Sequence, residues 1–174
     1  HKGWYQDEPQ KGFCLPCVPG EFANETGSTF CYECAVGKAS RRSNATNCAD
    51  CARGRYQNVI GQASCLPCIP GTFGNESGLT SCYECAIGKS VQISNVTSCL
   101  DCARGRYKNG IGQASCLPCI PGEFQNETGK TECKPCAEGT ASDKKNRTTP
   151  CDACAPGSHS TGNGAVACTL CLPG

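Results

Sequence analysis

Large apolar side chains are scarce in this chain. Leu, Ile, Val and Phe together supply only 24 of the 174 residues, with one Trp and no Met. A chain with so little hydrocarbon to bury cannot offset the entropy of folding through a hydrophobic core alone. We therefore expect covalent or metal cross-links to supply the missing stability.

Long apolar runs and an excess of one charge are also lacking. No stretch approaches the roughly 20 apolar residues that cross a bilayer, so the sequence predicts no membrane span. The net charge is +1 and no basic run exceeds two residues, which argues against nucleic-acid partners and anionic membranes. The chain has neither an initiator Met nor a signal peptide, which is typical of a processed chain or a fragment.

Groups for catalysis are few. The only histidines are His1 and His159, and the carboxylates are scattered along the chain. General acid–base chemistry needs such groups held close together around a substrate. We expect a protein that is not an enzyme and that carries no cofactor.

Cysteine and glycine, in contrast, are abundant, with 20 and 21 residues. This cysteine fraction, about 11%, is typical of secreted disulfide scaffolds. The cysteines form ten CxxC pairs, and successive pairs begin 17 residues apart with one exception, an 18-residue step. The pairs begin at Cys14, Cys31, Cys48, Cys65, Cys82, Cys99, Cys116, Cys133, Cys151 and Cys168. The chain is therefore an array of short repeats.

A second period of 51 residues lies above the first, because the units rotate through three types. The types are exemplified by "CLPCIPGTFGNESG", "CYECAIGKS" and "CARGRYKNGIGQAS". This organisation predicts a partial repeat at 1–13, three triple repeats at 14–64, 65–115 and 116–167, and the start of a further unit at 168–174.

Two backbone positions also repeat along the array. The sixth residue after the first Cys is Gly throughout, and the thirteenth is Gly or Asn, as at Gly27 and Asn44. Gly and Asn enter left-handed backbone geometry at low cost, so the chain is expected to bend there. The pattern predicts a small disulfide-rich β fold, an elongated rod of ten hairpin-like repeats with little core.

The CxxC pairs have three chemical interpretations. Ten pairs could hold five tetrahedral zinc ions, and a redox CxxC would need an activated thiolate at a helix start, of which the sequence shows no sign. Six N-x-[ST] triplets, however, return at 51-residue intervals and indicate passage through an oxidising, glycosylating lumen. Disulfides are favoured for that reason. The acceptor asparagines are Asn24, Asn44, Asn75, Asn95, Asn126 and Asn146.

Disulfide connectivity is narrowed by the repeat symmetry. Bonding the second Cys of each unit to the first Cys of the next respects both periods, whereas pairing units two by two gives a 34-residue module out of step with the 51-residue period. The second scheme leaves no cysteine over, and it stays open as the alternative. The favoured pairs are Cys17–Cys31, Cys34–Cys48, Cys51–Cys65, Cys68–Cys82, Cys85–Cys99, Cys102–Cys116, Cys119–Cys133, Cys136–Cys151 and Cys154–Cys168.

The stretch "CVPGEFANETGSTFC" at 17–31 resembles the cysteine-rich repeats of ephrin-type receptors. It is also similar to the first loop of a tumour-necrosis-factor-receptor module, in which C-x-x-G-x-aromatic leads through a turn to a second Cys. The resemblance implies that the two end cysteines of each loop bond to each other, and it implies elongated repeats in receptors or matrix proteins.

The favoured hypothesis is a subunit or segment of an extracellular glycoprotein filament or surface appendage, located outside the cell or on its surface. Cys14 and Cys171 would bond between copies, head to tail, and a stripe of unglycosylated units would associate laterally. Besides other copies of the chain, the expected partners are N-linked glycans. The alternative is a receptor or adhesion ectodomain that binds a protein ligand. The candidate lateral interface is Arg53, Arg55, Tyr56, Arg104, Arg106 and Tyr107.

Overall fold

The structure, a computed structural model, describes residues 1–9 and 11–172. Within those ranges every helix or strand is a two-residue β-strand, and no helix occurs. The strands are β1 (Trp4–Tyr5), β2 (Leu15–Pro16), β3 (Glu21–Phe22), β4 (Tyr32–Glu33), β5 (Lys38–Ala39), β6 (Ala49–Asp50), β7 (Arg55–Tyr56), β8 (Leu66–Pro67), β9 (Thr72–Phe73), β10 (Tyr83–Glu84), β11 (Lys89–Ser90), β12 (Leu100–Asp101), β13 (Arg106–Tyr107), β14 (Leu117–Pro118), β15 (Glu123–Phe124), β16 (Lys134–Pro135), β17 (Thr140–Ala141), β18 (Asp152–Ala153), β19 (Ser158–His159) and β20 (Thr169–Leu170).

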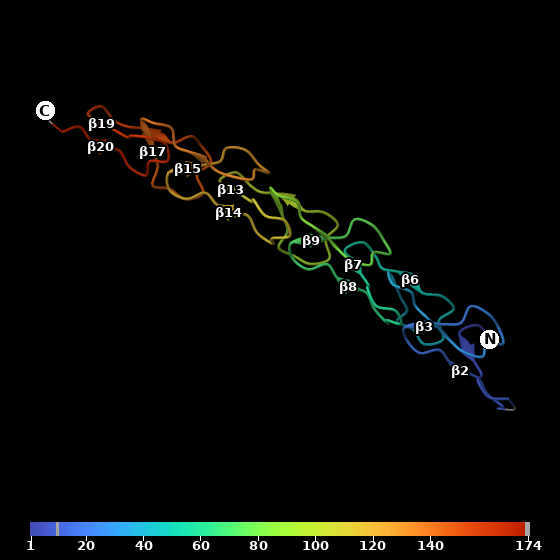
Figure 1. The fold of residues 1–174 in the computed structure, drawn as a ribbon. Helices are drawn as coiled ribbons and strands as arrows, with labels where there is room; N and C mark the ends of the chain where they lie inside the picture. The colour runs from blue at the N-terminus through green and yellow to red at the C-terminus, as the bar shows by residue number, and fades with distance from the viewer. Residues whose placement is uncertain (10, 173–174) are drawn as a thin grey trace. The chain divides into compact units, whose positions relative to one another are not determined.

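The strands form ten two-stranded sheets, each made by strands that follow one another in the chain (Figure 1). In β3 and β4, for example, Phe22 lies opposite Tyr32 in antiparallel register. Each hairpin starts after the sixth-position Gly of one repeat and ends in the CxxC of the next, because the turn residues lie between these two points. The expected disulfide-rich β class with ten hairpins is confirmed.

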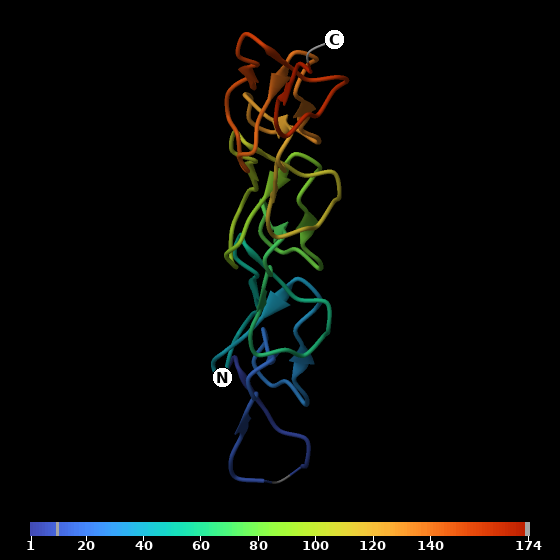
Figure 2. The ribbon, with the colours of Figure 1, turned by 90° about the vertical axis from the view of Figure 1, so that its left-hand side faces the viewer.

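The chain divides into two compact units. The first is His1–Tyr83 with Ile93–Ser98, and the second is Glu84–Gln92 with the chain from Cys99 onward. Figure 2 shows the hairpins of the first unit in blue to green and those of the second in yellow-green to red.

Backbone hydrogen bonds join neighbouring repeats in the first unit. The amide of Gly20 donates to the carbonyl of Ser40 at 2.8 Å, and the amide of Gly37 donates to Gln57 at 2.7 Å, 20 residues ahead in both cases. A second series runs backward, and in it the amide of Asn44 donates to the carbonyl of Cys17 at 2.8 Å. Each repeat therefore presents main-chain donors and acceptors to its neighbour.

The same bonds recur in the second unit. The amides of Gly88 and Gly105 donate to Lys108 and Gln125 at 2.8 and 2.7 Å, and the amide of Gly129 donates back to Cys102 at 2.8 Å. An interaction that depends on main-chain atoms tolerates different side chains in successive repeats, which is why three unit types can use a single stacking geometry.

Left-handed backbone occurs where the sequence predicted it. Asn44, Asn95 and Asn146 have φ values of +53°, +63° and +56°. Several of the sixth-position glycines are required for a second reason, the close approach of another backbone segment. At Gly37, with φ +76°, an added Cβ would lie 2.2 Å from the carbonyl oxygen of Gly78, two repeats ahead. Only Gly satisfies both the dihedral angle and this close approach.

The buried interior consists largely of sulfur. The second Cys of eight of the CxxC pairs has at most 1% of its surface exposed, and Ala23, Val91 and Ala141 are among the few buried apolar side chains beside them. Two polar side chains, Lys108 and Gln125, are as deeply buried. Cross-links thus occupy the place that hydrocarbon side chains take in larger domains. The eight cysteines are Cys17, Cys34, Cys51, Cys68, Cys85, Cys102, Cys119 and Cys136.

Candidate functional site

Disulfide bonds link each repeat to the next. Nine are present, and each joins the second Cys of one CxxC to the first Cys of the following pair, with Cα–Cα distances of 5.5 to 5.7 Å. The two-by-two pairing does not occur in the described part of the chain. The bonds are Cys17–Cys31, Cys34–Cys48, Cys51–Cys65, Cys68–Cys82, Cys85–Cys99, Cys102–Cys116, Cys119–Cys133, Cys136–Cys151 and Cys154–Cys168.

Comparison with known proteins places the sequence of these repeats in a family. The family model described as tyrosine-protein kinase ephrin type A/B receptor-like matches residues 37–85, 88–124 and 110–148, which together cover more than half of the chain. The chain belongs to this ephrin receptor-like family. A comparison with curated proteins gave no match. Cysteine-rich ephrin receptor-like repeats joined by disulfides are extracellular-type domains.

Two cysteines of the ephrin receptor-like array have no disulfide partner among the described residues. Cys14 and Cys171 are both exposed. The Sγ of Cys171 lies 3.7 Å from Nδ1 of His159 in the neighbouring strand β19. Cys14 holds the position whose equivalents bond to the preceding repeat, and Cys171 holds the position whose equivalents bond to the following one.

The six acceptor asparagines of the ephrin receptor-like repeats are all exposed on the surface. Asn24, Asn75 and Asn126 follow the first strand of their hairpins, whereas the other three lie at the left-handed turn. Each acceptor side chain is therefore accessible from solvent.

The third-type repeats hold the arginines of the expected lateral stripe. Arg53 and Arg104 are exposed, whereas Arg55 and Arg106 use Nη1 to donate a hydrogen bond of 3.1 Å to the carbonyl of Cys65 and of Cys116, respectively. Tyr56 and Tyr107 in β7 and β13 are half-buried. One arginine of each pair thus stabilises its own hairpin, and the other is available to a partner.

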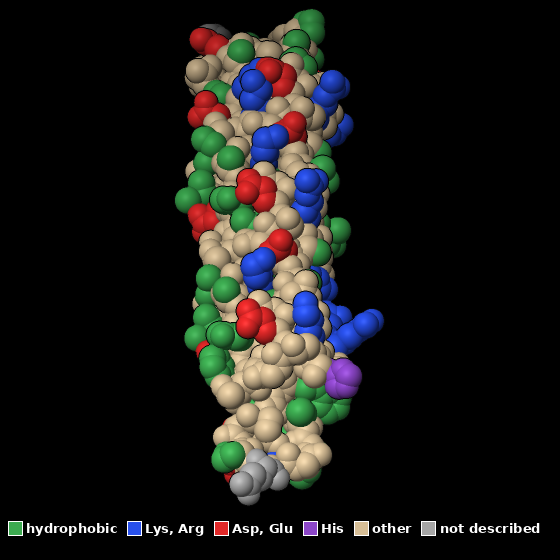
Figure 3. Space-filling view, turned by 90° about the vertical axis from the view of Figure 1, so that its right-hand side faces the viewer, with side chains coloured by type: hydrophobic (Ala, Val, Ile, Leu, Met, Phe, Trp, Pro, Cys, Tyr) green, Lys and Arg blue, Asp and Glu red, His purple; other side chains and the backbone are tan. Residues whose placement is uncertain are grey.

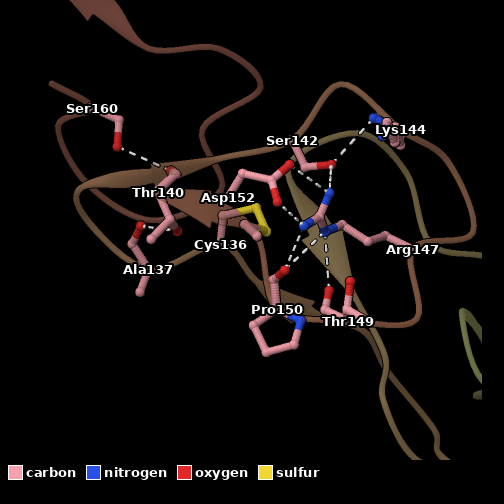
Figure 4. The surroundings of a disulfide bond; sticks show 11 residues. Cys136, Ala137, Thr140, Ser142, Lys144, Arg147, Thr149, Pro150, Asp152 and Ser160 are labelled. Carbon is pink, nitrogen blue, oxygen red and sulfur yellow. Dashed lines mark hydrogen bonds and ion pairs between the residues drawn. A yellow bond between two sulfur atoms is a disulfide. The ribbon is translucent and has the colours of Figure 1, made fainter. Parts of the chain in front are cut away.

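Arg147, which sequence reasoning missed, organises the one loop that carries an extra residue. Its Nη2 and Nη1 contact the two carboxylate oxygens of Asp152 at 2.6 and 3.0 Å, and it also donates to the carbonyls of Thr149 and Pro150 (Figure 4). The hydrogen bond from Arg147 lowers the pKa of Asp152. The 15-residue separation of Cys136 and Cys151 was the available signal, because an inserted residue needs new partners.

Lys108 is the second feature that the sequence analysis missed. Its side chain is fully buried, and its Nζ donates to the carbonyl of Lys89 at 2.5 Å. Burial lowers the pKa of Lys108, while the charge of Glu84 acts in the opposite direction. In the preceding triple repeat Gln57 holds the same place and donates to the carbonyl of Ser64 at 2.8 Å. Both residues at this position of the triple repeat thus have a long side chain with an N–H donor.

A cleft of about 620 Å³ lies in the first unit beside the loop 39–50. Arg41, Arg42 and Arg55 line it together with Asn44, and its one carboxylate, Asp50, is paired with Lys38 at 2.6 Å. The lining contains hydroxyls and arginines but no histidine.

Ion pairs lie on the surface of several hairpins. Lys38–Asp50 and Lys89–Asp101 are cross-strand neighbours at 2.6 Å, and acidic and basic side chains lie side by side on the face drawn in Figure 3. Exposed pairs of this kind stabilise a fold only slightly. Among residues 1–9 and 11–172, no cluster of three His, Cys, Asp or Glu could hold a metal ion, and no helix is long and apolar enough to cross a membrane.

Proposed function

We propose that this chain is a structural segment of an extracellular glycoprotein filament or surface appendage. The observation that carries the proposal is the repeating main-chain bond between neighbours, seen in Gly20–Ser40 and again in Gly88–Lys108. A unit that offers the same donors and acceptors to each neighbour can be added repeatedly without a new interface. The role is mechanical and non-catalytic.

Continuity between copies rests on the two exposed cysteines. A bond from Cys171 of one copy to Cys14 of the next would continue the linkage used nine times within the chain. A heterologous contact that does not close on itself extends into a fibre, and we propose this outcome here. Joining these two thiols releases two protons and two electrons, and a disulfide-bearing oxidant of the secretory lumen accepts the electrons.

Glycans cover the remaining surface in this proposal. In the secretory lumen an oligosaccharide is transferred from a lipid diphosphate to the amide nitrogen of an acceptor asparagine, which loses one proton as the lipid diphosphate leaves. All six acceptors are exposed, and the third-type repeats, which have none, keep a bare surface for lateral association.

Membership of the ephrin receptor-like family supports a second candidate, an ectodomain whose repeats bind a protein ligand. The two functions differ in whether the secreted chain forms covalent multimers with itself. We expect the wild-type chain to run on a non-reducing gel as a ladder of multiples of its 18.2 kDa polypeptide mass after glycans are removed.

The matched control replaces Cys14 and Cys171 by serine, which should leave a single monomer band with all nine internal disulfides. Fibres in electron micrographs of the wild-type chain, absent from the double variant, would support the filament. A wild-type chain that stays monomeric would overturn end-to-end bonding and favour the ectodomain.

A further inference from the structure

The first-type hairpins place a phenylalanine and an acceptor asparagine on one side of the strand. Ala23 lies between Phe22 and Asn24, is fully buried, and donates its amide to the carbonyl of Ala45 at 3.0 Å. Successive residues of an extended chain point to opposite faces. Phe22 is half-buried and Asn24 is exposed, and in the third first-type hairpin Lys134, which lies opposite Phe124, reaches the equivalent asparagine, so ring and asparagine share a face.

The partner strand and the residues just before it add two more rings to this face. Tyr32 lies opposite Phe22 in the register, with ring centroids 5.7 Å apart, and Phe30 meets the edge of Tyr32 at 4.7 Å. Phe30 and Tyr32 are 53% and 47% exposed. Three contiguous aromatic side chains, two of them about half exposed, form an apolar patch that another group can cover.

We propose that the N-linked glycan of Asn24 is this group, and that its first N-acetylglucosamine lies against the aromatic face formed by Phe22, Tyr32 and Phe30. One face of a pyranose ring carries axial C–H groups with partial positive charge, which complement the negative face of an aromatic ring. The inference rests on the proposed function, because it requires the chain to be glycosylated.

The second and third first-type hairpins form a graded series. Near Asn75, Phe73 and Tyr83 keep the 5.7 Å ring pair, but Ser81 stands where Phe30 does. Near Asn126 the ring opposite Phe124 is replaced by Lys134, whose Nζ instead binds Oδ1 of that asparagine at 3.0 Å. Packing of the sugar should therefore weaken in the order Asn24, Asn75, Asn126.

The second-type acceptors supply natural controls. Two residues before Asn44, Asn95 and Asn146 stand Arg42, Ile93 and Lys144, so no ring precedes the acceptor. These three asparagines also have positive φ, so their backbone is not the extended chain that aligns Phe22 with Asn24. Their sugars should behave as mobile groups in water.

The test uses the secreted chain with its glycans trimmed to a single isotope-labelled N-acetylglucosamine. Aromatic ring currents should shift the sugar protons at Asn24 upfield of those at Asn44, with a smaller shift at Asn75. Tyr32→Lys, which copies the third hairpin, should reduce the shift at Asn24, and Lys134→Tyr should increase the shift at Asn126. Both variants alter an exposed side chain and leave every disulfide in place.

The outcomes separate this inference from the function on which it rests. Full occupancy of Asn24 by mass spectrometry, with sugar shifts equal to those at Asn44, would overturn the packing and leave the glycoprotein proposal intact. An unoccupied Asn24 in the secreted chain would overturn both.

Discussion

Replacing Gly37 by alanine tests how the repeats are stacked. The residue has φ +76°, and a Cβ there would lie 2.2 Å from the carbonyl oxygen of Gly78. The left-handed conformation alone costs an alanine about 1–2 kcal/mol. The contact adds a second cost, because 2.2 Å is far shorter than the distance between a non-bonded carbon and oxygen, and the two backbones must move apart.

The size of the second cost follows from the bonds that this movement breaks. Gly37 donates to Gln57 at 2.7 Å, and its carbonyl accepts from Cys51 at 2.8 Å. Each net hydrogen bond contributes about 1 kcal/mol. Gly37→Ala should therefore destabilise its stack by about 3–4 kcal/mol.

Gly139 provides the matched control. It holds the sixth position of its own repeat with φ +79°, but an added Cβ there would meet nothing within 4 Å. Gly139→Ala should destabilise its repeat only by the cost of the left-handed backbone for alanine, about 1–2 kcal/mol. Repeat arrays do not unfold in two states, so native-state hydrogen exchange at the amides of Cys51 and Cys154 is the suitable measurement. Equal losses in the two variants would refute the argument from close approach.

Two further predictions concern exposed charges. Hydrogen bonds from Lys130 and Lys134 lower the pKa of Glu127 to about 2. These hydrogen bonds should therefore stabilise the fold at neutral pH, and this stabilisation should be lost as the pH falls from about 4.5 toward 2. A midpoint near 4 in an NMR titration of Glu127 would contradict this prediction. Arg104 has no partner among the described residues, so its side chain is available to a second copy of the chain. Arg104→Glu should therefore weaken lateral association in sedimentation velocity, whereas Lys145→Glu should not. Identical sedimentation of both variants would exclude the arginine stripe.

The sequence predicted those features that depend on local chemistry. The 17-residue step, the left-handed Asn44 and Gly27, and the short hairpins follow from residue types whose backbone preferences act within one repeat. The cysteine spacing pointed to bonds between adjacent repeats for the same reason.

Contacts made between repeats were not predictable in this way. The close approach of Gly37 to Gly78 joins main-chain atoms 41 residues apart, and main-chain atoms leave no pattern in side-chain identity. Lys108 likewise looks like an ordinary surface lysine until the carbonyl of Lys89 is placed beside its Nζ. The aromatic face near Asn24 needed the strand register, since Tyr32 and Phe22 belong to different strands of one hairpin.

The main-chain character of the junctions has a consequence for how such chains can change. A repeat that recognises its neighbour by amides, carbonyls and an empty Cβ position makes no demand on the outward side chains. Repeats bearing different surface groups are then interchangeable parts, and lengthening the array by duplication requires no new junction to be designed. The surface of each repeat is free to diversify while the stack beneath it stays the same.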